Sequence, residues 1–147
     1  MKIARDPRPA RRAEARSAEV ELQVPFHDVD SVGIVWHGHY AKYFELARCA
    51  LLDTFGYGYK QMAASGYVWP IVDFSLRYIK PARFEQKLRV RATLEEWEYR
   101  LKIAYLVTDA ASGERLTKGQ TIQVAVDKAS GEMLLASPAV LRERLGL

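Results

Sequence analysis

The stretch HYAKYFELARCALLDTF, residues 39–55, decides the fold of this chain. Apolar side chains recur in it at the three- and four-residue spacing of a helix, and polar side chains fill the gaps. The apolar positions are Tyr40, Tyr43, Phe44, Ala47, Ala50, Leu51 and Phe55. Gly56 and Gly58 follow directly, and glycine is typical of a helix end. The sequence therefore predicts a helix over residues 39–55, and its wide apolar arc indicates that it is deeply buried.

On both sides of this helix the sequence alternates apolar and polar residues, which is the period of a β-strand. The apolar side of the segment before the helix consists of Val20, Leu22, Val24 and Phe26. After the helix the alternation recurs over residues 72–78, 88–94, 101–107 and 122–126. We predict a strand at each of these places.

Short connections join the later strands. The segments DAASGE, residues 109–114, and DKASGE, residues 127–132, are glycine-containing turns typical of hairpins. Near the C-terminus, Ser137 as N-cap and Pro138 at the first helical position predict a short last helix. Because strands joined by hairpins pair antiparallel, we expect an α+β domain in which an antiparallel sheet of about five strands wraps around the central helix.

The excess positive charge lies at one end of the chain. Of the 147 residues, 1–16 hold six of the 22 Lys and Arg residues and two of the 18 acidic residues, so the rest has no net charge. We therefore predict a disordered basic tail over residues 1–17 and a single domain over residues 18–147. A body without basic bias does not favour nucleic-acid binding, which only the tail could support.

Cysteine use and hydropathy bear on the compartment. The single cysteine, Cys49, cannot form an internal disulfide and suits a reducing cytoplasm. No apolar run approaches the ~20 residues that span a bilayer. No apolar stretch follows the basic N-terminus as it would in a secretory signal. We expect a cytoplasmic protein without a membrane span.

The side chains able to do chemistry gather just before the helix, in FHDVDSVGIVWHGHY, residues 26–40. They are His27, Asp28, Asp30, His37 and His39. Such a group could be a metal site, an acid–base site or a polar loop without function. The strand alternation, carried forward, puts Asp28 and Asp30 on the apolar side. No second ligand cluster and no structural zinc spacing accompany the histidines, so we predict no metal. The chain also lacks the G-x-S-x-G elbow of serine hydrolases.

The run from Asp28 to Arg48, DVDSVGIVWHGHYAKYFELAR, resembles the signature of the 4-hydroxybenzoyl-CoA thioesterase family, including its YbgC-type acyl-CoA thioesterases. The family pattern reads approximately D-x-D-x-x-G-x-V-[YW]-[HY]-x-x-Y-x-x-[YFW]-[FL]-E-x-A-R. The later segment LRYIKPARF, residues 76–84, resembles the family's R-Y-x-x-P-A run. The resemblance covers residues 20–127. One departure is His39, where many members carry Asn or another residue.

The resemblance implies a hotdog fold and hydrolysis of an acyl-CoA or acyl-carrier-protein thioester. It implies that Asp30 is the catalytic carboxylate, either as nucleophile or as general base, and that the backbone N–H of residue 37 is an oxyanion donor. It also implies homodimers or homotetramers. The structural alternatives are that Asp30 is only an N-cap or a turn former and that the His37 side chain caps the helix instead of orienting substrate or water.

Further contacts with the substrate can be suggested from residue type. Candidates for the acyl pocket are Trp36, Tyr40, Trp69 and Phe74. Coenzyme A, as part of the substrate, carries phosphates that Arg83, Lys87 or Arg89 could meet, although each of them taken alone favours a solvated charge on the face of a strand. No other cofactor is expected. The alternative function is a protein of the same fold that binds acyl-CoA or acyl-carrier protein without turnover.

Overall fold

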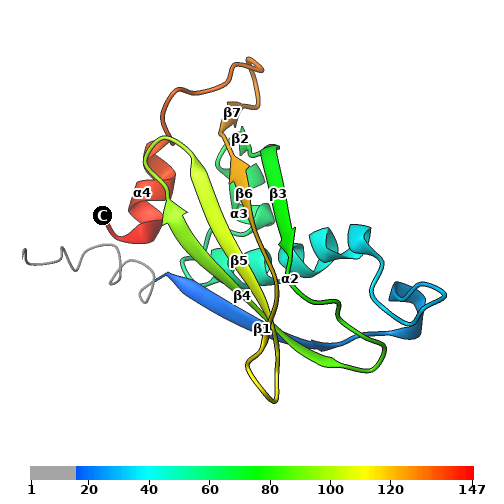
Figure 1. Cartoon of the computed structure of the whole chain (residues 1–147). Helices are drawn as coiled ribbons and strands as arrows, with labels where there is room; N and C mark the ends of the chain where they lie inside the picture. Colours follow the sequence, from blue (N-terminus) through cyan, green and yellow to red (C-terminus); the bar gives the residue numbers. More distant parts are fainter. Residues whose placement is uncertain (1–15) are drawn as a thin grey trace, which may run out of the picture.

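The computed structural model describes residues 16–147, which form a five-stranded antiparallel sheet packed against one long helix (Figure 1). The strands of this sheet are β1 (Ser17–Gln23), β3 (Ile71–Tyr78), β4 (Lys87–Glu96), β5 (Leu101–Asp109) and β6 (Arg115–Gln123). Their order is β1-β4-β5-β6-β3, so β1 and β3 lie at opposite edges. The predicted α+β fold, with an antiparallel sheet around a central helix, is confirmed.

The central helix begins as a 3-10 turn, η2 (His37–His39), and continues as α2 (Tyr40–Asp53). Its buried side chains include most of the apolar positions that the periodicity selected. They pack with the inner-face residues of the central strands into one core: Leu88, Val90, Ala92 and Leu94 of β4, and Leu101, Ile103, Tyr105 and Val107 of β5. After Thr54 the chain turns at Gly56, whose φ of 66° is left-handed. The predicted helix and its glycine stop are confirmed to within two residues.

A glycine in β6 lets α2 approach the sheet closely. The ring of Phe44 on α2 stacks on Tyr105 of β5, with centroids 4.4 Å apart and planes 3° apart. A Cβ built at Gly119 would lie 2.6 Å from the Phe44 ring and 2.4 Å from the carbonyl oxygen of Ser75. Any side chain at position 119 would therefore push the helix or the neighbouring strand away.

Short elements close the ends of the sheet. A two-stranded sheet pairs β2 (Tyr67–Val68) with β7 (Val126–Asp127), and two short helices are α3 (Tyr59–Ala64) and α4 (Ala139–Leu145). The two predicted turns are confirmed and share one geometry. In each, the carboxylate of the leading aspartate, Asp109 or Asp127, accepts the backbone N–H groups two and three residues further on.

One predicted strand is misplaced. The alternation predicted it over residues 122–126, but β6 runs over Arg115–Gln123, and Val126 belongs to β7. The middle of β6 reads Thr117, Lys118, Gly119, Gln120, which lacks an apolar side. It is extended because it pairs with both β5 and β3, so tertiary pairing outweighs the weak local preference.

Two further expectations are wrong. The strand alternation does not extend to Phe26, because a 3-10 turn, η1 (Phe26–Asp28), follows Val24, and the Phe26 side chain is 76% exposed. Asp28 is buried by that turn, whereas Asp30 is exposed. At the last helix the N-cap is Pro138 and not Ser137, whose buried hydroxyl has no hydrogen-bond partner in residues 16–147.

The predicted basic tail lies largely outside the part of the chain that the structure describes. Of its 17 residues, only Arg16 and Ser17 are described, and β1 already begins at Ser17. Within residues 16–147, no helix combines the length and the apolar character that a membrane crossing requires.

Candidate active site

The loop between β1 and the central helix folds into a tight hairpin that presents Asp30. Val29 and Val35 form an antiparallel bridge, and the backbone N–H of Asp30 donates to the carbonyl of Ile34 at 2.8 Å. Gly33 takes a φ of 85°, which suits glycine at the hairpin tip. The Asp30 Oδ1 accepts the N–H groups of Val32 at 2.9 Å and Ile34 at 3.4 Å. In residues 16–147, its Oδ2 has no hydrogen-bond partner and remains able to meet a ligand.

The segment after β3 holds this hairpin in place. The N–H of Val35 donates to the carbonyl of Ala82 at 2.8 Å, and the N–H of Phe84 donates to Gly33 at 3.1 Å. Ala82 in turn donates its N–H to the Tyr40 hydroxyl at 3.3 Å, so the same segment contacts the first residue of α2. The hairpin, the helix start and residues 79–84 thus form one connected wall.

A pocket of about 330 Å³ lies between these three parts. Its lining residues are Asp30, Ile34, Val35, Trp36, His37, Tyr40, Tyr78, Ile79, Lys80 and Pro81. Four predicted site residues, Asp30, Trp36, His37 and Tyr40, are therefore brought together. Sequence reasoning missed Tyr78 and Lys80, although both fall in the segment LRYIKPARF that carried the second part of the resemblance.

The helix start gives the pocket its positive end. The first N–H groups of a helix, here those of His37 and Gly38, have no acceptor within the helix, and the helix dipole adds partial positive charge there. The carbonyl of His37 accepts the Tyr78 hydroxyl at 3.0 Å. Backbone N–H groups without an acceptor, such as those of His37 and Gly38, can stabilise a developing oxyanion.

Trp36 forms the aromatic side of the pocket. Its ring lies 4.9 Å from the His37 ring and 5.4 Å from the His39 ring, and half of the side chain is exposed. A Cβ at Gly38 would come within 2.1 Å of the indole. Glycine at position 38 therefore allows the indole to fold over the first turn of the helix.

Asp28 connects the loop that carries Asp30 to the central helix by hydrogen bonds. Its buried carboxylate accepts the Lys42 ammonium and the Tyr43 hydroxyl, each at 2.6 Å. Burial alone would raise the pKa of Asp28, but the hydrogen bonds from Lys42 and Tyr43 outweigh it and leave the pKa lowered. Burial and the Asp28 carboxylate raise the pKa of Tyr43, so its hydroxyl stays protonated. Asp28 is thus a structural anion.

The Asp28 cluster has no geometry suited to a metal ion. His27 and His39 approach the Asp28 Oδ1 only to 3.7 and 3.9 Å, while the Lys42 ammonium lies at 2.6 Å. No group of three or more His, Cys, Asp or Glu side chains in the described part of the chain could hold a metal.

The two remaining candidates for acyl contact lie elsewhere in this chain. Trp69 is 7% exposed and donates its indole N–H to the Tyr57 hydroxyl at 3.1 Å. Phe74 lies on the edge strand β3 and packs on Phe44, with centroids 5.9 Å apart. Neither lines the pocket that contains Asp30. Their role as substrate contacts stays a prediction.

The cationic side chains suggested as contacts for the phosphates of coenzyme A differ in whether they already form ion pairs. Arg89 already pairs with Glu21 at 3.0 Å and with Glu19 at 3.5 Å on β1. Lys80, which the sequence reasoning did not select, lines the pocket and pairs with Glu114 at 2.8 Å. In the described residues, Arg83 and Lys87 are exposed and form no ion pair.

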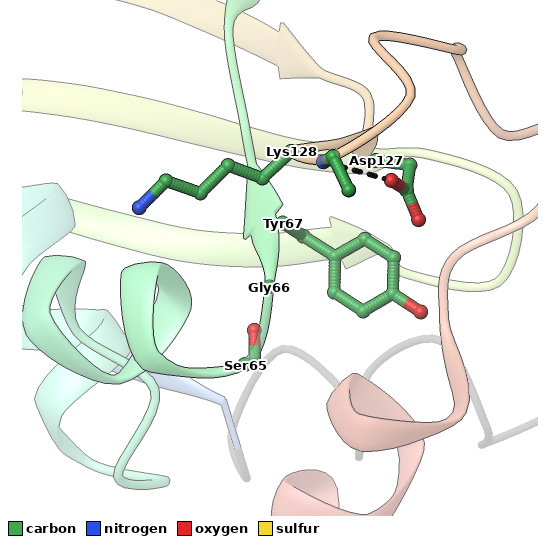
Figure 2. Close-up of a pocket in the computed structure, with 6 residues that line it drawn as sticks. Ser65, Gly66, Tyr67, Asp127 and Lys128 are labelled. Carbon is green, nitrogen blue, oxygen red and sulfur yellow. Dashed lines mark hydrogen bonds between the residues drawn. The ribbon is translucent and has the colours of Figure 1, made fainter.

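Figure 2 shows a second hollow, of about 390 Å³, at the β2–β7 pair. In this view the Tyr67 ring and the Lys128 side chain point in different directions, and the Asp127 carboxylate is bonded within its own turn. The backbone N–H of Ser130 is the main group that lowers the pKa of Asp127, and the Ala129 N–H adds to it. Asp127 thus shapes its own turn, and none of the predicted site residues lines this hollow.

Comparison with known proteins identifies the family of this chain. The family model described as the thioesterase-like superfamily matches residues 24–145. The candidate esterase sll0410 of Synechocystis is 30% identical over 86% of this chain and 77% of its own length. YneP of Bacillus subtilis, a candidate acyl-CoA thioesterase, is 30% identical over 75% of this chain and 80% of its own length.

Solved structures agree on the architecture. The structure of a variant 4-hydroxybenzoyl-CoA thioesterase complexed with 4-hydroxybenzoyl-CoA superposes with a TM-score of 0.76, covering 88% of this chain and 99% of that one, at 20% identity. The chain therefore has the hotdog fold and belongs to the thioesterase-like superfamily, a class of thioester hydrolases. The resemblance to the 4-hydroxybenzoyl-CoA thioesterase family is confirmed.

Proposed function

We propose that this protein hydrolyses acyl thioesters of coenzyme A or of an acyl carrier protein. In this proposal Asp30 is the catalytic carboxylate and the start of the central helix is the oxyanion hole. The observation that carries the proposal is that Asp30 and the first helical residue, His37, line one largely apolar pocket. An anion and a set of unpaired N–H groups at one pocket are what attack on a carbonyl requires.

The chemistry needs few groups. Either the Asp30 carboxylate attacks the acyl carbon, forming an anhydride that water then opens, or it takes a proton from the water that attacks. In both cases the carbonyl oxygen becomes an oxyanion facing the helix start, and the carbon–sulfur bond breaks with the electron pair leaving on sulfur. A thiol with a pKa of about 8.5 leaves without a strong general acid, so one carboxylate can suffice.

The remaining pocket residues suit an acyl thioester. Trp36, Tyr40 and Tyr78 supply aromatic surface for the acyl group, and Lys80 is a cation suited to an anionic carrier. The His37 imidazole is placed to orient substrate or water. The name of YneP, which is 30% identical, supports acyl-CoA as the substrate class.

We further propose that the protein works as a homodimer or homotetramer in the cytoplasm. The edge strand β3 supports self-association, because Val72, Phe74 and Tyr78 are each at least 40% exposed along it. An unpaired edge with apolar side chains readily pairs with another strand. The unpaired Cys49 supports a reducing compartment. Light scattering should report at least twice the 16.7 kDa chain mass, and a monomer at micromolar concentration would reject this part.

The alternative function is binding of acyl-CoA without turnover. One experiment separates the two: a panel of acyl-CoA and acyl-carrier-protein thioesters assayed by release of free thiol. We expect turnover by the wild type and a loss of at least about 100-fold in Asp30→Asn, the size typical of a lost acid–base group. Asp53→Asn, at the far end of α2, is the matched control. Binding without turnover by the wild type would favour the alternative, and full activity of Asp30→Asn would reject the role of Asp30.

A single turnover in ¹⁸O-labelled water distinguishes the two roles of Asp30. If the carboxylate is the nucleophile and water opens the anhydride at the aspartyl carbon, the label enters Asp30. If it is a general base, all of the label enters the released acid.

A further inference from the structure

Tyr78 joins the end of a strand to the start of the central helix, 41 residues earlier in the chain. It is the last residue of β3, and its neighbour across the ladder on β6 is the buried Thr117. Its hydroxyl donates to the His37 carbonyl at 3.0 Å, and its ring lies 5.4 Å from the Tyr40 ring. Tyr78 lines the same pocket as Asp30.

We propose that Tyr78 is a positioning residue for the reaction: by holding the His37–Gly38 peptide, it aims the Gly38 N–H out of the helix start, where it acts as an oxyanion donor. This inference rests on the proposed thioesterase function. The Gly38 N–H is then a second oxyanion donor beside the N–H of His37, and the Tyr78 side chain sets its orientation.

The geometry of a single peptide unit links the two groups. The His37 carbonyl and the Gly38 N–H belong to one planar trans peptide, in which they point in opposite directions. A hydrogen bond to the carbonyl therefore fixes the direction of the N–H. It also polarises the peptide and strengthens the N–H as a donor. Without the hydroxyl, only the 3-10 turn His37–His39 sets the orientation of this peptide.

The Tyr78 hydroxyl can donate to the His37 carbonyl at every physiological pH. Burial, with a smaller contribution from Tyr40, raises the pKa of Tyr78, so the group keeps its proton. Tyr78 as a residue is 48% exposed, and removing its hydroxyl opens no cavity. β3 stays paired with β6 along residues 71–78 without that contact. A change from tyrosine to phenylalanine therefore tests position without unfolding the strand.

The first test is steady-state kinetics of Tyr78→Phe on the best acyl-CoA of the panel. We expect kcat to fall about 10-fold, because small displacements of catalytic donors are costly, while KM stays within about twofold. The control is Tyr99→Phe, whose side chain is 64% exposed in the turn between β4 and β5. An unchanged kcat in Tyr78→Phe, or an equal rise in KM, overturns the positioning role.

The second test reads the peptide itself and does not depend on turnover. His37–Gly38 is the only His–Gly pair in the chain, so ¹³C-carbonyl histidine with ¹⁵N-glycine gives one signal in a carbonyl–amide correlation spectrum. We expect both its carbonyl and its amide shift to move in Tyr78→Phe and to stay in Tyr99→Phe. An unmoved signal overturns the inference. A wild type without turnover rejects the proposed function, and this signal still decides whether Tyr78 holds the peptide.

Discussion

The Lys42 ammonium lies 2.6 Å from the Asp28 carboxylate and ties the first turn of α2 to the loop that carries Asp30. The backbone carbonyl of Asp28 also accepts the N–H of Trp36 at 3.0 Å. Asp28 is therefore bonded both to the helix and to the far side of the Asp30 hairpin. The position of the catalytic candidate depends on a buried anion that does not touch the pocket.

Replacing that anion should make stability depend less on pH. We expect Asp28→Asn to lower the free energy of unfolding by about 2 kcal/mol at pH 7, the size of hydrogen bonds to a charged group. The pKa of Asp28 is lowered in the folded state, so its contribution is present above the unfolded value of about 3.9. It is lost as pH falls through the folded pKa.

Urea unfolding at pH 7 and pH 3 measures this difference. The difference in the free energy of unfolding between wild type and Asp28→Asn should be smaller at pH 3 than at pH 7. The exposed control Asp53→Asn should have the same free energy of unfolding as the wild type at both pH values. If Asp28→Asn lowered the free energy of unfolding equally at both pH values, the charge of Asp28 would contribute nothing to stability.

Gly38→Ala should displace Trp36 from the helix start. The new methyl group would occupy the space of the indole, so we expect a higher KM for acyl-CoA and a red shift of tryptophan emission. The cost in stability should be about 1 kcal/mol, at the low end for overpacking, because the half-exposed indole can move into solvent.

A double variant identifies the cause of the Gly38→Ala effect. If the clash with the indole is responsible, Gly38→Ala adds no further loss of stability in a Trp36→Ala background. Additive losses would point to the backbone of the turn instead.

Lys80 and Arg89 should differ in their effect on the affinity for coenzyme A. Lys80→Ala should raise KM about threefold, as expected for one exposed charge contact, and the effect should fade with added salt. Arg89→Ala should leave KM unchanged, because Arg89 does not line the pocket that contains Asp30 and pairs with Glu19 and Glu21 on β1. KM measured at low and high salt checks both. If Arg89→Ala raised KM more than Lys80→Ala, coenzyme A would instead bind on the outer face of β4.

Gly119→Ala should destabilise the fold at the close approach of α2 to β6. We expect a loss of about 2 kcal/mol in the free energy of unfolding, because both the Phe44 ring and the Ser75 carbonyl must move. Gln120→Ala, the half-buried neighbour on the outer face of β6, should change it by no more than about 0.5 kcal/mol. Equal midpoints in urea for the two variants would contradict the tight contact.

The sequence alone determined the elements whose local pattern and burial agree. The helix over residues 39–55 and the strands β4 and β5 carry their apolar face at the helical or strand period, because one side of each packs in the core. The motif around Asp30 and His37 likewise lies within one short segment. Gly33 takes the positive φ that suits glycine, whereas the 3-10 turn Phe26–Asp28 departs from the strand alternation that the sequence predicted.

Only the tertiary structure decided which distant residues complete the site. β6 is a polar segment that becomes a strand because two neighbours pair with it, and this pairing places β3 so that Tyr78 reaches His37. Lys80 joins the same pocket for the same reason, while Trp69 and Phe74 face other parts of this chain. Periodicity records which side of an element is buried. It does not record which elements become neighbours, because that depends on the summed packing of the whole chain.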